Sequence, residues 1–334
     1  MSEPFRASAD PVLAGLSIDD RDPAAAPVLE SDELCKQLDS LWLAEQCSTA
    51  RQIEVQILRW HKSKRCTFEI SLRRDLIGKV YATDREDVYQ VMERLARAGF
   101  GPDAEFSIPQ PIAYLPSLRL LLQEKVEGLE AKGVFRFGDE RQRAAAAERC
   151  ARWLARFHAL APPSGQVSDV EKILRRSKDK QELLSKEGGP LADKSEWLME
   201  GLRSARSSLG AIPMCAGHGH FGCYQIILAG GRTVVFDWDV YDVADPTRDV
   251  AGFILSLKRQ ALRRLGSIRE LDGAAQTFLE AYLTAGGHPR VASHLPFYTA
   301  AHCLRSAKWD VVRKPIGWRE HAEALLDEGL RTLG

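Results

Sequence analysis

The polar residues best suited to chemistry in this chain lie between His218 and Asp249. The segment begins His-Gly-His-Phe-Gly-Cys-Tyr-Gln and runs through an apolar stretch into Phe-Asp-Trp-Asp. Gln225 and Asp237 carry oxygen atoms, which Mg²⁺ prefers as ligands. The imidazole of His220 can accept a proton near neutral pH. The segment therefore holds candidates for a metal site beside a general base.

A tight turn is predicted to bring two of these residues together. Ile226–Leu228 and Thr233–Phe236 read as strands on either side of a Gly-Gly pair, which permits the positive φ angles of a tight hairpin. With the turn centred on the two glycines, residue 225 lies opposite residue 236 or 237. We therefore expect Gln225 and Asp237 to be adjacent at the open end of the hairpin, about 5 Å apart. The competing interpretation is that both side chains only cap strand ends.

The same segment contains residue types that bind zinc, in the pattern Cys-x2-His-x-His-x2-Cys over nine residues. Zinc sites usually join two separated ligand pairs. In a strand, His218 and His220 share one face while Cys215 and Cys223 face away. The spacing argues against zinc, which stays as an alternative.

Four aspartates follow the hairpin and could attract a cationic substrate. The Asp-Pro pair at 245–246 also has the chemistry of a helix start, which gives a structural interpretation. Asp239 shares a strand face with Asp237 if the strand continues. The four residues are Asp239, Asp242, Asp245 and Asp249.

The rest of the chain must position these residues, and its character changes near Gly128. Before that point the pattern predicts strands, with one helix between the third and fourth. After it the pattern predicts helices around the hairpin, so the fold class is α+β with two lobes. Residues 1–30 are expected to form a flexible arm, 31–127 the N-terminal lobe and 128–334 a helical C-terminal lobe. The expected strands are Ile53–Trp60, Cys66–Leu72, Leu76–Tyr81, Ile112–Leu115 and Leu118–Val126; the expected helices are Ser31–Cys47, Asp84–Ala98, Arg141–Leu160, Val167–Lys186 and Ser195–Leu209, with a mostly helical chain from Val250.

Composition excludes several classes of partner. The 334 residues are 45% hydrophobic and carry no net charge, so no global field favours nucleic acid or an acidic membrane. No run of 18 apolar residues could span a membrane, and the N-terminus lacks a secretory pattern. Seven scattered cysteines indicate reduced thiols and a cytoplasmic location. We expect a small-molecule partner.

Lys79 lies in the apolar strand Leu-Ile-Gly-Lys-Val-Tyr. An amine in the middle of such a strand costs solvation free energy unless it meets an anion. The alternative is an edge strand whose lysine points to solvent.

Residues 50–310 resemble the aminoglycoside phosphotransferase and choline kinase-like family of the protein kinase-like superfamily. That family reads His-Gly-Asp, then four residues, then Asn, then a hairpin ending in Asp-Trp. Here the phrase Val-Val-Phe-Asp-Trp-Asp, followed by Asp-Pro-Thr-Arg-Asp, carries the resemblance. His220 stands at the family's catalytic Asp and Gln225 at its Asn. The resemblance makes Asp237 the metal-binding carboxylate, Gln225 the second metal position, and His218 a residue that holds the loop.

The resemblance implies ATP and Mg²⁺ bound between the lobes and phosphoryl transfer to a small-molecule hydroxyl. Lys79 would contact phosphates, while Glu86, Gln90 or Glu93 would pair with it. Backbone groups of Gln123, Glu124, Lys125 and Val126 would meet the adenine. His158, Asp245 and Asp249 would be structural, and Val167–Ser195 with Pro296–Arg313 would line the acceptor pocket. Because the catalytic Asp is absent, a nucleotide-binding pseudokinase is the alternative; the oligomeric state stays open.

Overall fold

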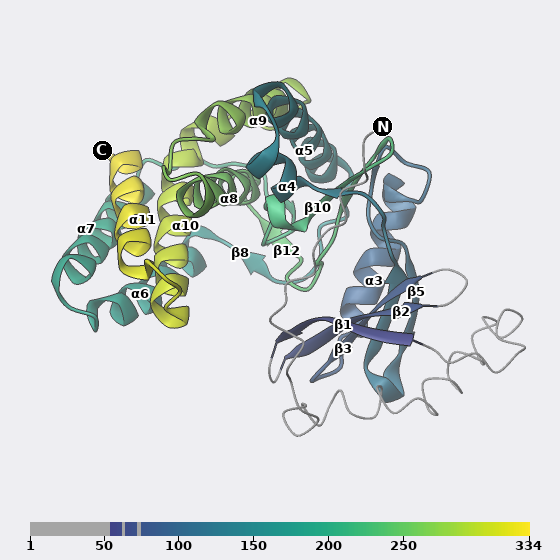
Figure 1. The fold of residues 1–334 in the computed structure, drawn as a ribbon. Coiled ribbons are helices and arrows are strands. Elements are labelled where there is room, and N and C mark those ends of the chain that lie inside the picture. Colours follow the sequence, from purple (N-terminus) through teal and green to yellow (C-terminus); the bar gives the residue numbers. More distant parts are fainter. Residues whose placement is uncertain (1–53, 62–63, 72–74) are drawn as a thin grey trace, which may run out of the picture. The chain divides into compact units, whose positions relative to one another are not determined.

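The computed structural model describes residues 54–61, 64–71 and 75–334 (Figure 1). They divide into two compact units, one reaching to Tyr89 and including Pro111–Lys125, the other formed by Gln90–Gln110 and Val126–Gly334. The expected N-terminal arm and the helix Ser31–Cys47 lie outside the described residues. The lobe boundaries at 31–127 and 128–334 stay a prediction.

The first unit is built on a five-stranded antiparallel sheet in the order β1-β2-β3-β6-β5. All five strands were expected, and β3 has the expected bounds. Phe68 and Ile70 pack with Leu120 and Leu122 on one face of the sheet, which forms the core of this unit. Gly78 is required there because a Cβ would lie 2.5 Å from the Phe68 ring. The strands are β1 (Glu54–His61), β2 (Arg65–Ser71), β3 (Leu76–Tyr81), β5 (Pro111–Leu115) and β6 (Leu120–Glu124).

Helix α3 (Glu86–Leu95) follows β3 and continues across the boundary between the units. The amide of Glu86 donates to the Asp84 carboxylate at 3.2 Å, so Asp84 opens the helix as expected. A wider turn, Ala96–Phe100, ends the helix with Gly99 at φ 102°.

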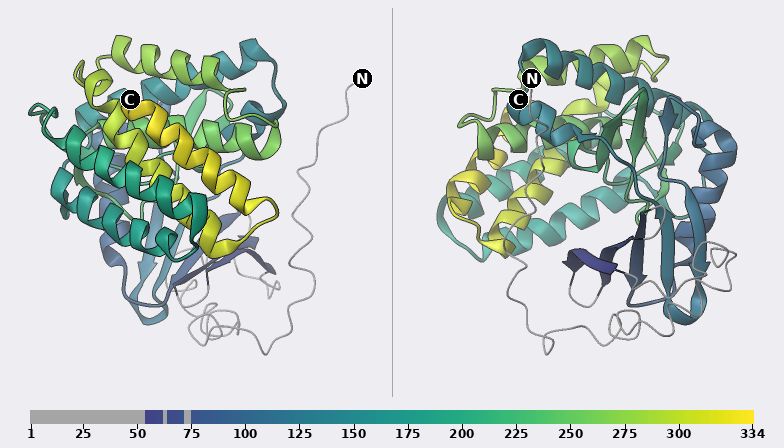
Figure 2. Two further views of the ribbon diagram at one scale, coloured as in Figure 1. Left: turned by 90° about the vertical axis from the view of Figure 1, so that its left-hand side faces the viewer. Right: turned by 45° about the vertical axis from the view of Figure 1, so that its right-hand side comes forward.

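The second unit is mainly helical, as predicted (Figures 1 and 2). Two of its helices, which were expected at Val167–Lys186 and Ser195–Leu209, have different bounds in the structure. Val167–Ser168 forms a strand before α6, and α7 begins at Gly189 because Pro190 is compatible with a first helical turn. The helices are α4 (Ala131–Phe137), α5 (Glu140–Leu160), α6 (Val170–Ser185), α7 (Gly189–Arg206), α8 (Thr247–Arg264), α9 (Asp272–Thr284), α10 (Val291–Arg313) and α11 (Trp318–Leu333).

Two small sheets hold the polar segment in this unit. The hairpin β10-β11 lies between the short strands β4 and β7, and β12 lies between β8 and β9. The sequence did not indicate the short strands, since most have only two or three residues. The strands of the two sheets, including the predicted hairpin, are β4 (Phe106–Ser107), β7 (Leu129–Glu130), β8 (Val167–Ser168), β9 (Cys215–Gly217), β10 (Ile226–Ala229), β11 (Arg232–Val235) and β12 (Asp242–Ala244).

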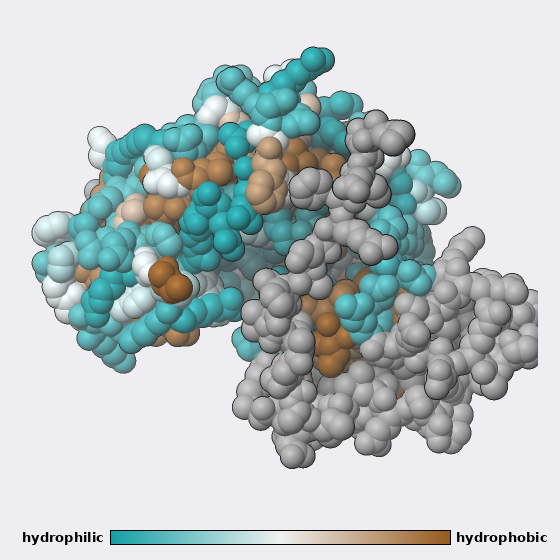
Figure 3. Space-filling view, in the orientation of Figure 1, coloured by the Kyte–Doolittle hydropathy of each residue, from teal (hydrophilic) through white to brown (hydrophobic). Residues whose placement is uncertain are grey.

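Aromatic side chains fill the space beneath the polar segment. The Trp153 ring of α5 stacks on Phe157 at 5.2 Å and on Phe221 at 5.7 Å between centroids. Trp238 is buried against the same group. These rings anchor both ends of the segment to α5. On the face of the second unit seen in Figure 3, hydrophilic side chains prevail and apolar ones lie scattered.

No helix among the described residues is both long and apolar enough to cross a membrane. The five cysteines in the described part of the chain are all free thiols.

Candidate functional site

The hairpin has the register that its sequence predicted. Ile226 pairs with Val235, and the amide of Phe236 donates to the carbonyl of Gln225 at 3.0 Å. Residue 225 therefore lies opposite residue 236, one position before Asp237. Of the two glycines in the turn, only Gly231 has a positive φ, at 87°.

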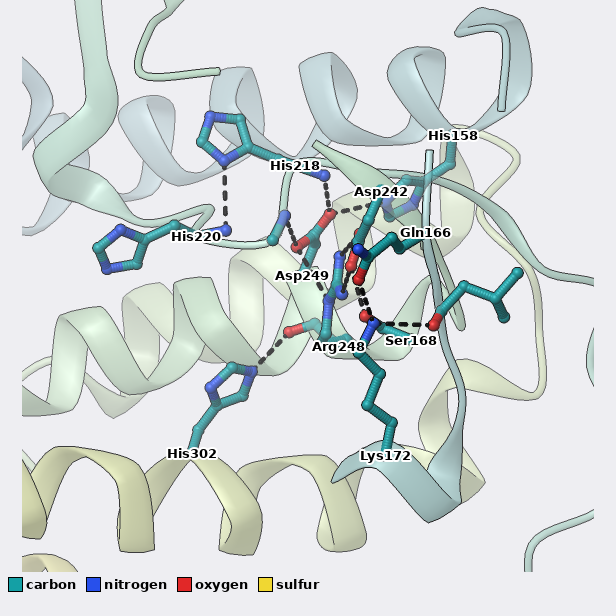
Figure 4. A network of polar contacts seen from close by, with 12 residues as sticks. His158, Gln166, Ser168, Lys172, His218, His220, Asp242, Arg248, Asp249 and His302 are labelled. Carbon is teal, nitrogen blue, oxygen red and sulfur yellow. Dashed lines mark hydrogen bonds and ion pairs between the residues drawn. The ribbon is translucent and has the colours of Figure 1, made fainter. Parts of the chain in front are cut away.

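Asp249, in the first turn of α8, holds the loop that carries the two histidines. Its carboxylate accepts the amides of His218 at 2.7 Å and Gly219 at 3.0 Å (Figure 4). Burial opposes the charged form, but the Arg248 guanidinium at 3.8 Å and the nearby His158 keep the pKa of Asp249 well below its usual value. The carboxylate is thus ionised and structural, as the resemblance implied.

The neighbouring aspartates are also committed to internal partners. Asp242 accepts two hydrogen bonds from Arg248, at 2.6 and 2.7 Å. Asp245 accepts the amide of Thr247 at 2.7 Å and contacts His294 at 2.8 Å. These contacts support the structural interpretation of both carboxylates over the attraction of a cationic substrate.

His218 is fully buried, and both its ring nitrogens are engaged. Its Nε2 lies 3.1 Å from the Phe236 carbonyl, and its Nδ1 accepts the His220 amide at 3.3 Å. These contacts assign the proton to Nε2. Burial lowers the pKa of His218, so the ring is neutral and joins the loop to the end of the hairpin.

His220 lies on the outer side of this loop, and its ring points away from the Asp249 network (Figure 4). The residue is solvent-exposed, although protein atoms crowd the ring. This crowding, and then the Arg305 charge, lower the pKa of His220 to about 4. The imidazole is neutral at pH 7 and is able to accept a proton.

Asp237 has a left-handed backbone, with φ at 77°. Such a conformation is uncommon outside glycine and clusters at functional sites. The next residue, Trp238, is buried with its ring 4.7 Å from that of His218, which fixes the backbone on this side. Asp237 is half-buried, and its charge raises the pKa of both His218 and His220 against the larger effects of burial. An accessible carboxylate there suits a hard cation.

Gln225 is buried, and its amide reaches back into the histidine loop. With the amide nitrogen placed to donate, it bonds the carbonyls of His220 at 3.2 Å and Gly222 at 3.3 Å. The amide oxygen of Gln225 then points away from these two carbonyl groups. Gln225 therefore ties the loop to the hairpin.

The first unit contains the other predicted site residues. Lys79 is only 5% exposed and β3 is an inner strand, so the interpretation as a solvent-facing edge lysine is wrong. Gln123 is buried in β6, and Lys125 binds Glu69 at 2.8 Å. The chain passes from one unit to the other between Lys125 and Val126.

The zinc interpretation finds no support in the described residues, which contain no group of three His, Cys, Asp or Glu side chains able to hold a metal ion. Cys215 pairs with Ala244 in a sheet, and Cys223 is buried with its amide bonded to Ser256 at 2.9 Å.

The sequence did not indicate that one face of α8 supports the histidine loop. Ser256 accepts the Cys223 amide, and the Tyr224 hydroxyl donates to Gln260 at 3.2 Å. The only sequence feature that points to this face is the spacing of four residues between Ser256 and Gln260. That spacing places both side chains on one side of the helix but does not show which segment they contact.

Comparison with known proteins identifies the family. The sequence model of the phosphotransferase enzyme family matches residues 55–294, so the chain belongs to that family. No curated protein matches at a significant level. The family is one of phosphotransferases that act on small molecules.

Solved structures show the same fold at low identity. A choline/ethanolamine kinase family protein from Mesorhizobium loti has a TM-score of 0.63 and 16% identity, covering 90% of this chain and 94% of its own. The choline kinase of Streptococcus pneumoniae has a TM-score of 0.60 and 13% identity, with coverages of 89% and 99%. A thermostable mutant of aminoglycoside phosphotransferase APH(4)-Ia has a TM-score of 0.59 and 14% identity, with coverages of 87% and 97%. The α+β, protein kinase-like fold is thereby confirmed.

Proposed function

We propose that this protein transfers the γ-phosphoryl group of ATP to a hydroxyl group on a small molecule, with Mg²⁺ as the metal. The observation that carries the proposal is the hairpin end in the second unit. There Gln225 lies opposite Phe236, next to the accessible carboxylate of Asp237, and binds the loop that presents His220. Family membership supplies the reaction type.

The candidate residues of the hairpin and of the first unit have the following roles in this proposal. Asp237 binds Mg²⁺, and the amide oxygen of Gln225 is the second protein ligand. Bound Mg²⁺ supplies positive charge to the phosphate oxygens. Lys79 contacts phosphates, and backbone groups of residues 123–126 meet the adenine.

His220 serves as the proton acceptor. The acceptor oxygen forms a bond to the γ-phosphorus while the bond from that phosphorus to the bridging oxygen of ADP breaks. The hydroxyl proton passes to the neutral imidazole and then to solvent. His218 positions the loop and does not touch the substrate, because its side chain is fully buried.

A nucleotide-binding protein without transfer activity is the second candidate. His220 has a lowered pKa and supplies no negative charge, and the nitrogen of Gln225 is bound to the loop. These properties of His220 and Gln225 would slow phosphoryl transfer without affecting the role proposed for Asp237.

Titration of ATP with and without Mg²⁺ tests the binding step. Asp237→Asn is the matched variant, since Asn tolerates a positive φ and loses only the charge. We expect Mg²⁺-dependent affinity to fall about tenfold or more. Asp193→Asn, on the exposed side of α7, should leave the affinity unchanged. An affinity for ATP that is the same with and without Mg²⁺ would count against the proposal.

Measurement of ADP release with a panel of alcohols and amino sugars then separates the two candidates. Acceptor-dependent release supports transfer. Tight MgATP binding with no release on any acceptor supports the second candidate.

A further inference from the structure

Basic side chains from three helices of the second unit lie near one another, and two of them, Arg305 and Arg259, lie close enough to His220 for their charges to act on it. Arg259 lies on α8, Arg305 on α10, and Arg176 and Lys180 one turn apart on α6. Burial, and then the neighbouring cations, lower the pKa of Lys180 to about 8 and that of Arg305 to about 10. These four side chains are called the basic cluster below.

Helix α8 brings Arg259 to the loop. A Cβ on Gly252 would lie 3.0 Å from the Phe221 carbonyl oxygen, so this face of α8 touches the residue after His220. Ser256, one turn on, accepts the Cys223 amide. Arg259 follows Gly252 by seven residues and so lies on the same face.

Helix α10 brings Arg305 to the same place. The Nε2 of His302 lies 2.9 Å from the Arg248 carbonyl, at the start of α8. Further along, Arg263 of α8 pairs with Asp310 of α10. Arg305 lies between these two contacts and three residues after His302, and therefore beside the part of α8 that carries Arg259.

No carboxylate pairs directly with Arg259 or Arg305 in the described part of the chain, where the charges of Asp310 and Asp249 act on them only from a longer distance. The side chains of Arg259 and Arg305 make no hydrogen bond or ion pair there, and the Nε of Arg259 is buried without a partner. Lys180 bonds only the Arg176 carbonyl, at 2.5 Å. Asp310 is paired with Arg263, and Asp179 is exposed beside Lys180. Partly buried guanidinium groups without a counter-ion are costly, and a bound anion would offset that cost.

We propose that the basic cluster binds a carboxylate or phosphate group on the phosphoryl acceptor, which is therefore an anionic hydroxy compound. The inference rests on the proposed function, since it takes His220 as the proton acceptor for that hydroxyl. The planar fork of an arginine binds either anion through two parallel hydrogen bonds. Arg305 is the central residue, because its charge acts on both His220 and Lys180.

Calorimetric titration of matched hydroxy compounds, with ADP and Mg²⁺ saturating, tests the inference. The anions are D-gluconate and glycerol 3-phosphate. Their neutral counterparts are D-glucose and glycerol, and the corresponding amines are D-glucosamine and serinol. We expect at least one anion to bind at least about tenfold more tightly than its neutral counterpart. Arg305→Gln should remove that difference, and Arg305→Lys should restore part of it. Arg313→Gln, an exposed change in the last turn of the same helix, should leave it intact.

Three results would overturn the inference. One is a neutral or aminated compound that binds as well as the anions. Another is a preference for anions that survives Arg305→Gln. The third is an equal loss of MgATP affinity in Arg305→Gln, which would assign the cluster to the nucleotide. Failure of MgATP to bind, alongside anion binding that depends on Arg305, would instead refute the proposed function and leave the anion site standing.

Discussion

The carboxylate of Asp249 accepts the backbone amide of His218 at 2.7 Å, joining the first turn of α8 to the loop that presents His220. The second oxygen accepts the amide of Gly219, so both hydrogen bonds go to the same two-residue stretch. The buried carboxylate of Asp249 thus fixes the position of the proposed proton acceptor, although the two residues are about thirty positions apart in the sequence.

Asp249→Asn should destabilise the protein by about 3 kcal/mol. The amide nitrogen of Asn would face a backbone donor, and the charge that offsets Arg248 would be lost from a buried site. Urea unfolding followed by circular dichroism measures the change.

Glu196→Gln is the control, because Glu196 is exposed on α7 and its loss should change stability by less than about 0.5 kcal/mol. Equal unfolding midpoints for Asp249→Asn and the wild type would show that the carboxylate does not hold the loop.

The hairpin could be predicted from sequence because its determinants are local. Runs of consecutive apolar residues mark β10 and the second half of β11, and the glycine pair between them sets the register. The predicted register placed residue 225 opposite residue 236 or 237, and the structure shows that it lies opposite residue 236. Strand β3 was predicted at its observed bounds for the same reason.

The features that could not be predicted are assembled from distant segments. Strand β4 has two residues and pairs Phe106 with Thr233, more than 120 positions away, so no local pattern reveals it. The basic cluster combines three helices, each of which carries ordinary charges in sequence. The orientation of the Gln225 amide depends on carbonyl groups of a loop whose path the sequence does not fix.

The two glycines of the hairpin turn should respond differently to substitution. Gly231 has a φ of 87°, whereas no positive φ occurs at Gly230, and a Cβ at either position would meet no atom within 4 Å. Gly231→Ala should therefore destabilise the protein by about 1 kcal/mol through backbone strain alone. Gly230→Ala should be neutral or slightly stabilising. Thermal unfolding of the pair checks this, and equal losses in both variants would contradict the turn geometry.

His302 should make the protein less stable in mild acid. Burial, and then the Arg305 charge, lower the pKa of His302 from 6.5 to about 3 in the folded state. Between these values the unfolded chain binds a proton that the folded chain does not. The stability from this group is therefore complete above pH 6.5 and is lost as the pH falls toward 3.

His302→Gln removes this titration and keeps a side-chain donor for the Arg248 carbonyl. Between pH 7 and pH 5 the wild type should lose about 2 kcal/mol more stability than the variant. Urea unfolding at the two pH values gives the comparison, in which contributions from Asp249 and His218 cancel. Parallel losses in the two proteins would mean that His302 is protonated in the folded state.

His220→Asp should raise turnover about tenfold if His220 is a weakened proton acceptor. Burial, and then the Arg305 charge, lower the pKa of His220 to about 4, so the imidazole is no stronger a base than a carboxylate. It also lacks the negative charge that would orient the acceptor hydroxyl. Arg305 and Arg259, which disfavour a charged imidazole, would favour an ionised Asp at the same position.

His220→Asn is the matched control, since it has a similar shape to Asp but neither accepts a proton nor carries charge. Its turnover should fall below that of the wild type by at least about tenfold. Steady-state ADP release on one acceptor compares the three proteins. Equal rates in all three would remove His220 from the chemical step, because neither basicity nor charge at that position would then affect transfer.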